Sequence, residues 1–159
     1  WAWSERSEEM VGGVDQGSLE VLRDVRASSL PCYALTNMEA ETYPLRVRRF
    51  PFLTWFDGTL VSGQEGAAKP DPDIFLRLLD RFALDAPTTL MIDDSSQNID
   101  AAGRLGMQTI LFRSHRQLRM ELEAAGVLGR LTPVGPSTGP ATGRRPRSLE
   151  PAVGIEPTT

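Results

Sequence analysis

The chain has 159 residues, a formal net charge of −4 and a pI near 5.1. This length fits one domain that can bury a real core, and the acidic balance argues against a general nucleic-acid or anionic-membrane binder, which needs a basic face. No apolar run approaches the roughly 20 residues of a membrane span, and the N-terminus lacks a signal-peptide pattern. The single cysteine, Cys32, cannot form an internal disulfide, so we expect a reducing, cytoplasmic location. The single histidine, His115, excludes chemistry that needs several imidazoles.

The first third of the chain predicts a helix followed by a strand. Residues 1–16 are polar and broken by glycines, and we expect them to be the remnant of a cap or linker. Ser18 is the predicted N-cap of a helix whose apolar residues recur at helical spacing. The apolar run 32–35 then predicts a buried strand that ends in Thr36 and Asn37.

The middle of the chain predicts a bent helix, a short strand and a well-capped helix. Residues 38–50 can form a helix bent at Pro44, residues 51–56 an aromatic connector and residues 60–62 a brief strand. A loop over 63–68 leads to Lys69, and Asp71 followed by Pro72 is a strong helix start. The expected buried face of that helix is Ile74, Phe75, Leu78, Leu79 and Phe82.

The remaining elements complete an alternating pattern. Residues 88–92 predict a buried strand that runs into Asp93 and Asp94; a helix over 98–105, a strand over 109–112 and a helix over 114–125 follow. Alternating helices and strands indicate βαβ units, an α/β fold and a mostly parallel sheet over residues 17–128. Residues 129–159 hold half of the 12 prolines, and we expect a disordered tail.

Polar residues follow three of these apolar or loop segments. Thr36-Asn37 can donate hydrogen bonds to a phosphate, Lys69 supplies a compact positive charge, and Asp93-Asp94 can hold Mg²⁺. Taken singly, Thr36 is more simply a helix cap, Lys69 a surface cation, and the two carboxylates a helix cap and a solvated group. Their order along the chain favours a phosphate and metal site.

The chain resembles the helical-cap members of the haloacid dehalogenase-like (HAD) hydrolase superfamily over about residues 1–128. The resemblance rests on three motifs in the right order, within residues 33–37, 61–75 and 92–98. It implies a Rossmann-like three-layer sandwich that acts on a small phosphorylated substrate.

The resemblance also implies roles for particular residues. Thr36 and Asn37 bind the transferred phosphoryl group, and Lys69 neutralises charge on an aspartyl-phosphate intermediate. Asp94 ligates Mg²⁺, the implied cofactor, while Asp93 and Asn98 support the ligand sphere.

One family motif has no counterpart. Members begin with a strand carrying Asp-x-Asp, whose first Asp is the nucleophile, and nothing like it precedes Thr36. Asp57 is followed by Gly-Thr-Leu, as in that motif, but Trp55 stands at the nucleophile position, so Asp57-Gly58 is interpreted as a turn. We therefore expect a chain truncated at its N-terminus, lacking most of the cap, inactive alone and prone to self-association through unpaired strands.

These observations leave three functional alternatives. A Mg²⁺-dependent phosphatase is favoured because Asp94 lies in a metal-capable cluster. A 2-haloacid dehalogenase uses the same scaffold without a metal, and a non-catalytic remnant could still bind phosphate. For the tail, read-through into non-coding sequence is favoured over a basic docking motif at Arg144-Arg145-Pro146-Arg147.

Overall fold

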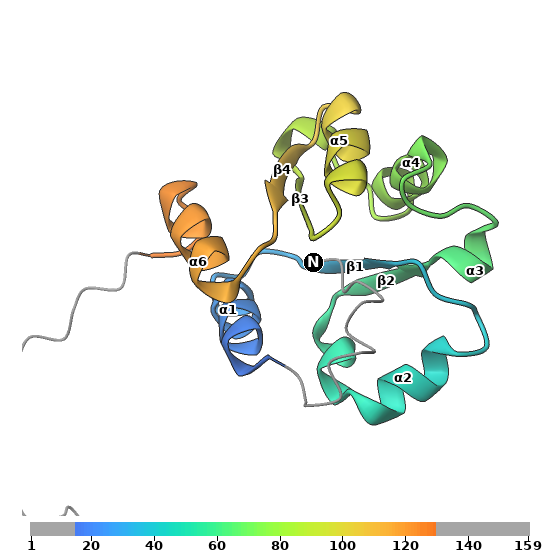
Figure 1. Cartoon of the computed structure of the whole chain (residues 1–159), viewed down its shortest axis with the longest axis horizontal. Coiled ribbons are helices and arrows are strands. Elements are labelled where there is room, and N and C mark those ends of the chain that lie inside the picture. Colours follow the sequence, from blue (N-terminus) through green and yellow to red (C-terminus); the bar gives the residue numbers. More distant parts are fainter. Residues whose placement is uncertain (1–14, 130–159) are drawn as a thin grey trace, which may run out of the picture.

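The computed structural model describes residues 15–129 and consists of helices alternating with short parallel strands (Figure 1). In chain order the elements are α1 (Gln16–Ala27), β1 (Tyr33–Thr36), α2 (Tyr43–Arg49), the 3-10 helix η2 (Pro51–Trp55), β2 (Gly58–Val61), α3 (Ser62–Glu65), α4 (Pro72–Arg81), the 3-10 helix η3 (Ala86–Thr88), β3 (Leu90–Asp93), α5 (Ser96–Arg104), β4 (Gln108–Leu111) and α6 (His115–Ala124). The α/β class and the parallel strands predicted from the sequence are confirmed.

The four strands form two parallel pairs. β1 pairs with β2, with Thr36 opposite Val61, and β3 pairs with β4, with Asp93 opposite Leu111. Within residues 15–129 the two pairs do not bond to each other. A largely apolar cleft of about 600 Å³ lies between them and is lined by residues of both β1 and β3.

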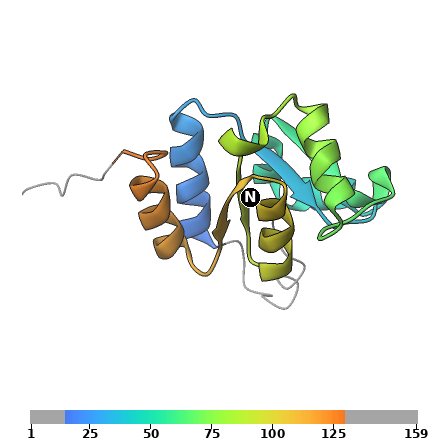
Figure 2. The same ribbon diagram turned by 90° about the horizontal axis from the view of Figure 1, so that it is seen from above.

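Helices cover both faces of the β3–β4 pair, as the Rossmann-like prediction requires (Figure 2). Alternate residues of a strand point to opposite faces. Met91 accordingly packs in one core with α4 and α5, whereas Leu90 and Ile92 pack in the other with α1 and α6. The first core also contains Leu35 of β1 and Leu60 of β2, so shared hydrophobic burial joins the two strand pairs.

The start of α4 matches a strong local signal in the sequence. The Asp71 side chain accepts the Asp73 N–H at 3.0 Å, and Pro72 lies in the first turn of α4. The face of α4 that the sequence predicts is buried at Ile74, Phe75 and Leu78 and partly buried at Leu79 and Phe82.

Two predicted helix starts are wrong. The N-cap of α1 is Asp15, whose carboxylate accepts the N–H groups of Gly17 and Ser18, whereas Ser18 lies in the first turn. Helix α2 begins at Tyr43, so it is not a longer helix bent at Pro44. Pro44 stands in the first turn because the N–H that it lacks has no intrahelical partner there.

Other differences are local. The predicted loop over 63–68 includes the end of the short helix α3, and the aromatic connector is the 3-10 helix η2. β3 begins at Leu90 because the residues before it form η3. In the part of the chain that the structure describes, no helix is long and apolar enough to cross a membrane. The expectations for residues 1–14 and 130–159, including the tail and its basic motif, lie outside the described residues.

Candidate active site at the strand ends

The predicted site residues lie at the carboxyl ends of the strands. Thr36 is the last residue of β1 and is buried, and Asn37 follows it. Asp93 is the last residue of β3, and Asp94 follows it. In open α/β sheets this end of the strands is where ligands bind.

Lys69 and Asp93 form a buried ion pair. Lys69 Nζ lies 2.8 Å from Asp93 Oδ2, and the side chains are 4% and 1% exposed. Burying either charge alone is costly, so each requires the other. The structure therefore excludes the interpretation of Lys69 as an ordinary surface cation.

The second carboxylate oxygen of Asp93 is also occupied. Asp93 Oδ1 accepts the Ser95 N–H at 2.8 Å and the Asn98 Nδ2–H at 3.0 Å. These bonds tie the end of β3 to the start of α5. Asn98 thus contacts Asp93 directly.

Asn37 pairs with the main chain of Lys69. Asn37 Oδ1 accepts the Lys69 N–H and Asn37 Nδ2 donates to the Lys69 carbonyl, both at 2.8 Å. One chain of contacts therefore joins Asn37, Lys69, Asp93 and Asn98. The fold brings these four predicted residues together from segments far apart in sequence.

Asp94 is the exposed carboxylate available to a metal in this group. Among the described residues, no group of three or more His, Cys, Asp or Glu side chains could hold a metal ion. Mg²⁺ commonly binds one or two carboxylates and completes its shell with waters and substrate phosphate oxygens. The donor set fits such a shared site, with Asp94 as protein ligand, and does not fit an all-protein cage.

Asp57 lies at the opposite end of the first strand pair. Its carboxylate accepts the Cys32 N–H at 2.7 Å, and its own N–H donates to the Cys32 carbonyl at 2.7 Å, just before Tyr33 pairs with Gly58. Burial, and secondarily the Asp57 carboxylate, raises the pKa of the Cys32 thiol. Asp57 itself lies in a bend, whereas Gly58, which the sequence assigned to the same turn, is the first residue of β2.

Two features of the site were missed from the sequence. The first is the hydrogen bond from the Ser95 main-chain N–H to Asp93, which cannot be predicted from residue types because every residue except proline has this group. Lys69 is the only lysine among the 17 basic residues of the chain, and the other 16 are arginine. That composition was a usable signal, because lysine and arginine are not interchangeable where a compact charge is required.

Comparisons with known proteins agree with this geometry. A family model described as haloacid dehalogenase-like hydrolase matches residues 6–106. A sesquiterpene phosphatase from Aspergillus oryzae is 30% identical over 94 residues, which cover 58% of this chain and 47% of that protein. The chain spans less than half the length of the curated relatives that it matches most strongly.

Solved structures show the same likeness. A HAD family enzyme from Bacteroides thetaiotaomicron, in complex with magnesium and inorganic phosphate, has a TM-score of 0.57 and 27% identity over 63% of this chain and 53% of that chain. An uncharacterised protein from Corynebacterium glutamicum has a TM-score of 0.63 over 80% of this chain and 92% of that chain. At 19% identity, this second likeness concerns the fold alone.

Proposed function

This chain belongs to the haloacid dehalogenase-like hydrolase family, and from that premise we propose that it is part of a Mg²⁺-dependent phosphatase acting on a small phosphorylated metabolite. The observation that carries the proposal is the buried Lys69–Asp93 pair at the strand ends. An ammonium has three N–H donors and Asp93 takes one, so two remain for an anion. The likeness to a phosphatase and to an enzyme holding magnesium and phosphate supports this choice.

Each side chain has a distinct part in the proposed site. The Thr36 hydroxyl donates to a phosphoryl oxygen, Asn37 belongs to the same site, and Lys69 neutralises the phosphoryl charge. Asp94 would hold Mg²⁺, with Asp93 and Asn98 supporting the segment that carries it. The metal, when bound, supplies a Lewis acid that polarises the phosphoryl group.

The covalent step requires a group that has no counterpart before Thr36. In an aspartyl-phosphate mechanism a carboxylate oxygen bonds to phosphorus while the bond to the departing alcohol breaks, and water then hydrolyses the acyl phosphate. We propose that residues 1–159 alone bind phosphate without this turnover. Joining an N-terminal strand with Asp-x-Asp and a cap should then confer Mg²⁺-dependent phosphatase activity.

The test compares the 159-residue chain, the extended chain and an extended chain whose first Asp is changed to Asn. We expect phosphate release from phosphate monoesters by the second protein only. Turnover by the unextended chain would show that another residue is the nucleophile and would overturn the assignment.

A dehalogenase is the main enzymatic alternative. The extended chain can be assayed on phosphate monoesters and on 2-haloacids, with and without EDTA. We expect phosphate release that EDTA abolishes, because Asp94 acts through Mg²⁺. Halide release that resists EDTA would replace the phosphatase proposal with the dehalogenase.

A binding module without catalysis is the non-enzymatic alternative. Titration of the 159-residue chain with phosphate should shift the NMR signals of Thr36, Asn37 and Lys69 at millimolar concentration. If those signals stay fixed, or if others move instead, the anion site is not assembled in this chain.

Self-association is the last part of the proposal. β1 and β3 line the two sides of the apolar cleft, and within residues 15–129 each pairs with one other strand. Open strand edges beside an apolar cleft favour pairing with another chain. Size-exclusion chromatography should show oligomers of the 159-residue chain and a monomer of the extended one; a sharp monomer of the shorter chain would contradict this.

A further inference from the structure

Both hydrogen bonds of the Asn37 side chain are made with one residue. It accepts the N–H of Lys69 and donates to the carbonyl of Lys69, 32 positions further along the chain. The amide orientation is fixed by this pairing, because a flipped amide would place donor against donor and acceptor against acceptor. The end of β1 thereby holds the main chain of Lys69.

The side chain of Lys69 is held from the other strand pair. Its ammonium meets Asp93 at the end of β3, while its main chain is bound to Asn37 at the end of β1. A lysine ammonium is a point charge on a flexible four-carbon stem, so its position depends on both anchors. Asn37 and Asp93 therefore set the place of the ammonium together.

Turning the Asn37 amide toward a phosphate would disturb this arrangement. If the amide turned to a ligand, the N–H and C=O of Lys69 would lose their partners at a partly buried position. Leaving such groups unpaired carries the full cost of their lost solvation. The resting geometry thus favours an indirect part for Asn37.

We propose that Asn37 is a positioning residue, which contributes to phosphate binding by fixing the main chain of Lys69 and not by touching the phosphate with its side chain. This inference rests on the proposed function in so far as phosphate is the ligand. The coupling of Asn37 to the Lys69 ammonium can be measured without any ligand.

The chain offers a clean probe, because Lys69 is its only lysine. Labelling the full 159-residue chain with ¹³C,¹⁵N-lysine gives one set of side-chain NMR signals. In ligand-free Asn37→Ala we expect the Lys69 Nζ and Cε signals to shift and ammonium hydrogen exchange to accelerate about tenfold. Titration with inorganic phosphate should show a Kd weakened by a similar factor, about tenfold.

Three further variants separate positioning from other effects. Asn37→Asp keeps an acceptor for the Lys69 N–H but loses the donor, so it should give a smaller shift. Thr36→Val should weaken phosphate binding while the ligand-free Lys69 signals stay in place. Ser62→Ala removes only the hydrogen bond from the Ser62 hydroxyl to the carbonyl of Met38, the residue after Asn37. It should leave the ligand-free Lys69 signals and the Kd for phosphate unchanged.

The outcomes are distinct. If Asn37→Ala weakens phosphate binding while the ligand-free Lys69 signals stay unchanged, Asn37 contacts the ligand directly and the inference is wrong. If Ser62→Ala moves the signals as much, loop loosening explains them and the inference also fails. If the backbone amide spectrum shows that Asn37→Ala does not fold, the ligand-free Lys69 signals and the phosphate Kd of Asn37→Asp decide instead. Absence of phosphate binding by the unmodified chain would reject the proposed function, whereas the ligand-free signals would still decide the coupling.

Discussion

Lys69 Nζ and Asp93 Oδ2 lie 2.8 Å apart and join a loop before α4 to the end of β3 inside the protein. Asp94, the next residue, is exposed. Two adjacent carboxylates of the same motif therefore have different environments. The buried one holds a cation of the protein itself, and the exposed one is available to a metal.

Changing Asp93 and Asp94 separately tests this division. Asp93→Asn leaves the Lys69 ammonium buried without a counter-charge and should lower the free energy of unfolding by about 3–5 kcal/mol. Asp94→Asn, a matched change at an exposed position, should alter it by less than about 0.5 kcal/mol. Urea unfolding measures both. Equal effects of the two substitutions would contradict the burial of the Lys69–Asp93 pair.

Gly63 allows the loop after Asn37 to lie against α3. A Cβ atom there would come within 2.6 Å of the Ala40 nitrogen, which is backbone and cannot swing away. Gly63→Ala should therefore destabilise the protein by about 1–3 kcal/mol through overpacking. Gly103→Ala is the control, because its Cβ would meet only Thr109 Cγ2 at 3.9 Å. In the last turn of α5, where alanine is also a better helix former than glycine, Gly103→Ala should stabilise the protein by up to about 1 kcal/mol. Thermal or urea unfolding that gives both changes the same sign would count against this packing.

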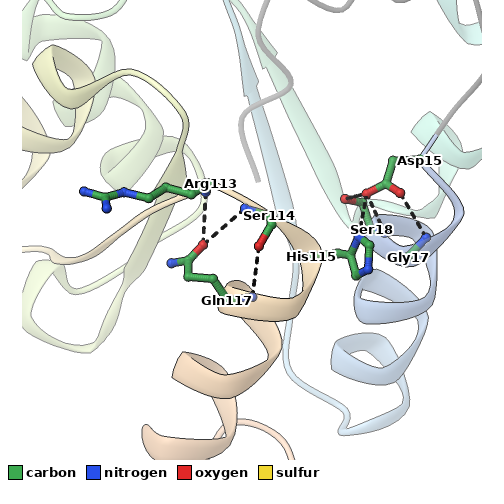
Figure 3. Close-up of polar contacts among 7 residues, drawn as sticks. All are labelled: Asp15, Gly17, Ser18, Arg113, Ser114, His115 and Gln117. Atoms are coloured by element: carbon green, nitrogen blue, oxygen red, sulfur yellow. Dashed lines mark hydrogen bonds and ion pairs between the residues drawn. The ribbon is translucent and has the colours of Figure 1, made fainter.

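Asp15 lies in a cluster of polar contacts at the start of α1 (Figure 3), and its carboxylate makes that start sensitive to acid. The Ser18 hydroxyl bonds to its carboxylate at 2.6 Å, and His115 Nδ1 of α6 lies 3.2 Å away. The Ser18 hydroxyl, with help from His115 and against the effect of burial, lowers the pKa of Asp15 below 3.8. Because the folded state favours the ionised form, the resulting stability is present above the unfolded pKa and is lost as pH falls through the folded one.

Asp15→Asn isolates that charge, since asparagine is an equally good N-cap. The difference in unfolding free energy between the unmodified chain and the variant should be constant above about pH 5 and shrink toward pH 2. Ser18→Ala should reduce the pH-dependent part of this unfolding free energy, because it removes the hydroxyl that bonds to the Asp15 carboxylate. Urea unfolding at a series of pH values measures it; curves that remain parallel down to pH 2 would show that the contact does not favour the ionised carboxylate.

Asp57 should matter for stability and not for chemistry. Asp57→Ala removes the acceptor of the Cys32 N–H and should cost about 1 kcal/mol of stability. In the extended chain, Asp57→Asn should leave phosphatase turnover intact, because Asp57 stands at the amino end of β2. Loss of turnover in a folded Asp57→Asn protein would identify Asp57 as a catalytic group.

Much of the fold followed from local patterns. The α/β class, the order of helices and strands, and the start of α4 at Asp71-Pro72 depend on hydrophobic periodicity and helix capping, which act within a few residues. The sequence also indicated which polar residues follow the strands, and hence the set Thr36, Lys69 and Asp93-Asp94. The start of α1 was predicted wrongly, because the sequence analysis took Ser18 as the N-cap and the structure has Asp15 there.

The partners within the site were decided by the tertiary structure alone. The sequence predicted Asp94 as the metal ligand with Asp93 in support, but it did not indicate that folding buries Asp93 against Lys69, 24 positions away, and leaves Asp94 exposed. The side chain of Asn37 pairs with the main chain of Lys69, which the sequence did not indicate. Such contacts depend on where strand ends meet in space, and the free energy of a buried charge or amide depends on the partner it meets there. Residues close to Asp93 or Asn37 in the sequence determine neither where the strand ends meet nor which partner a buried group finds there.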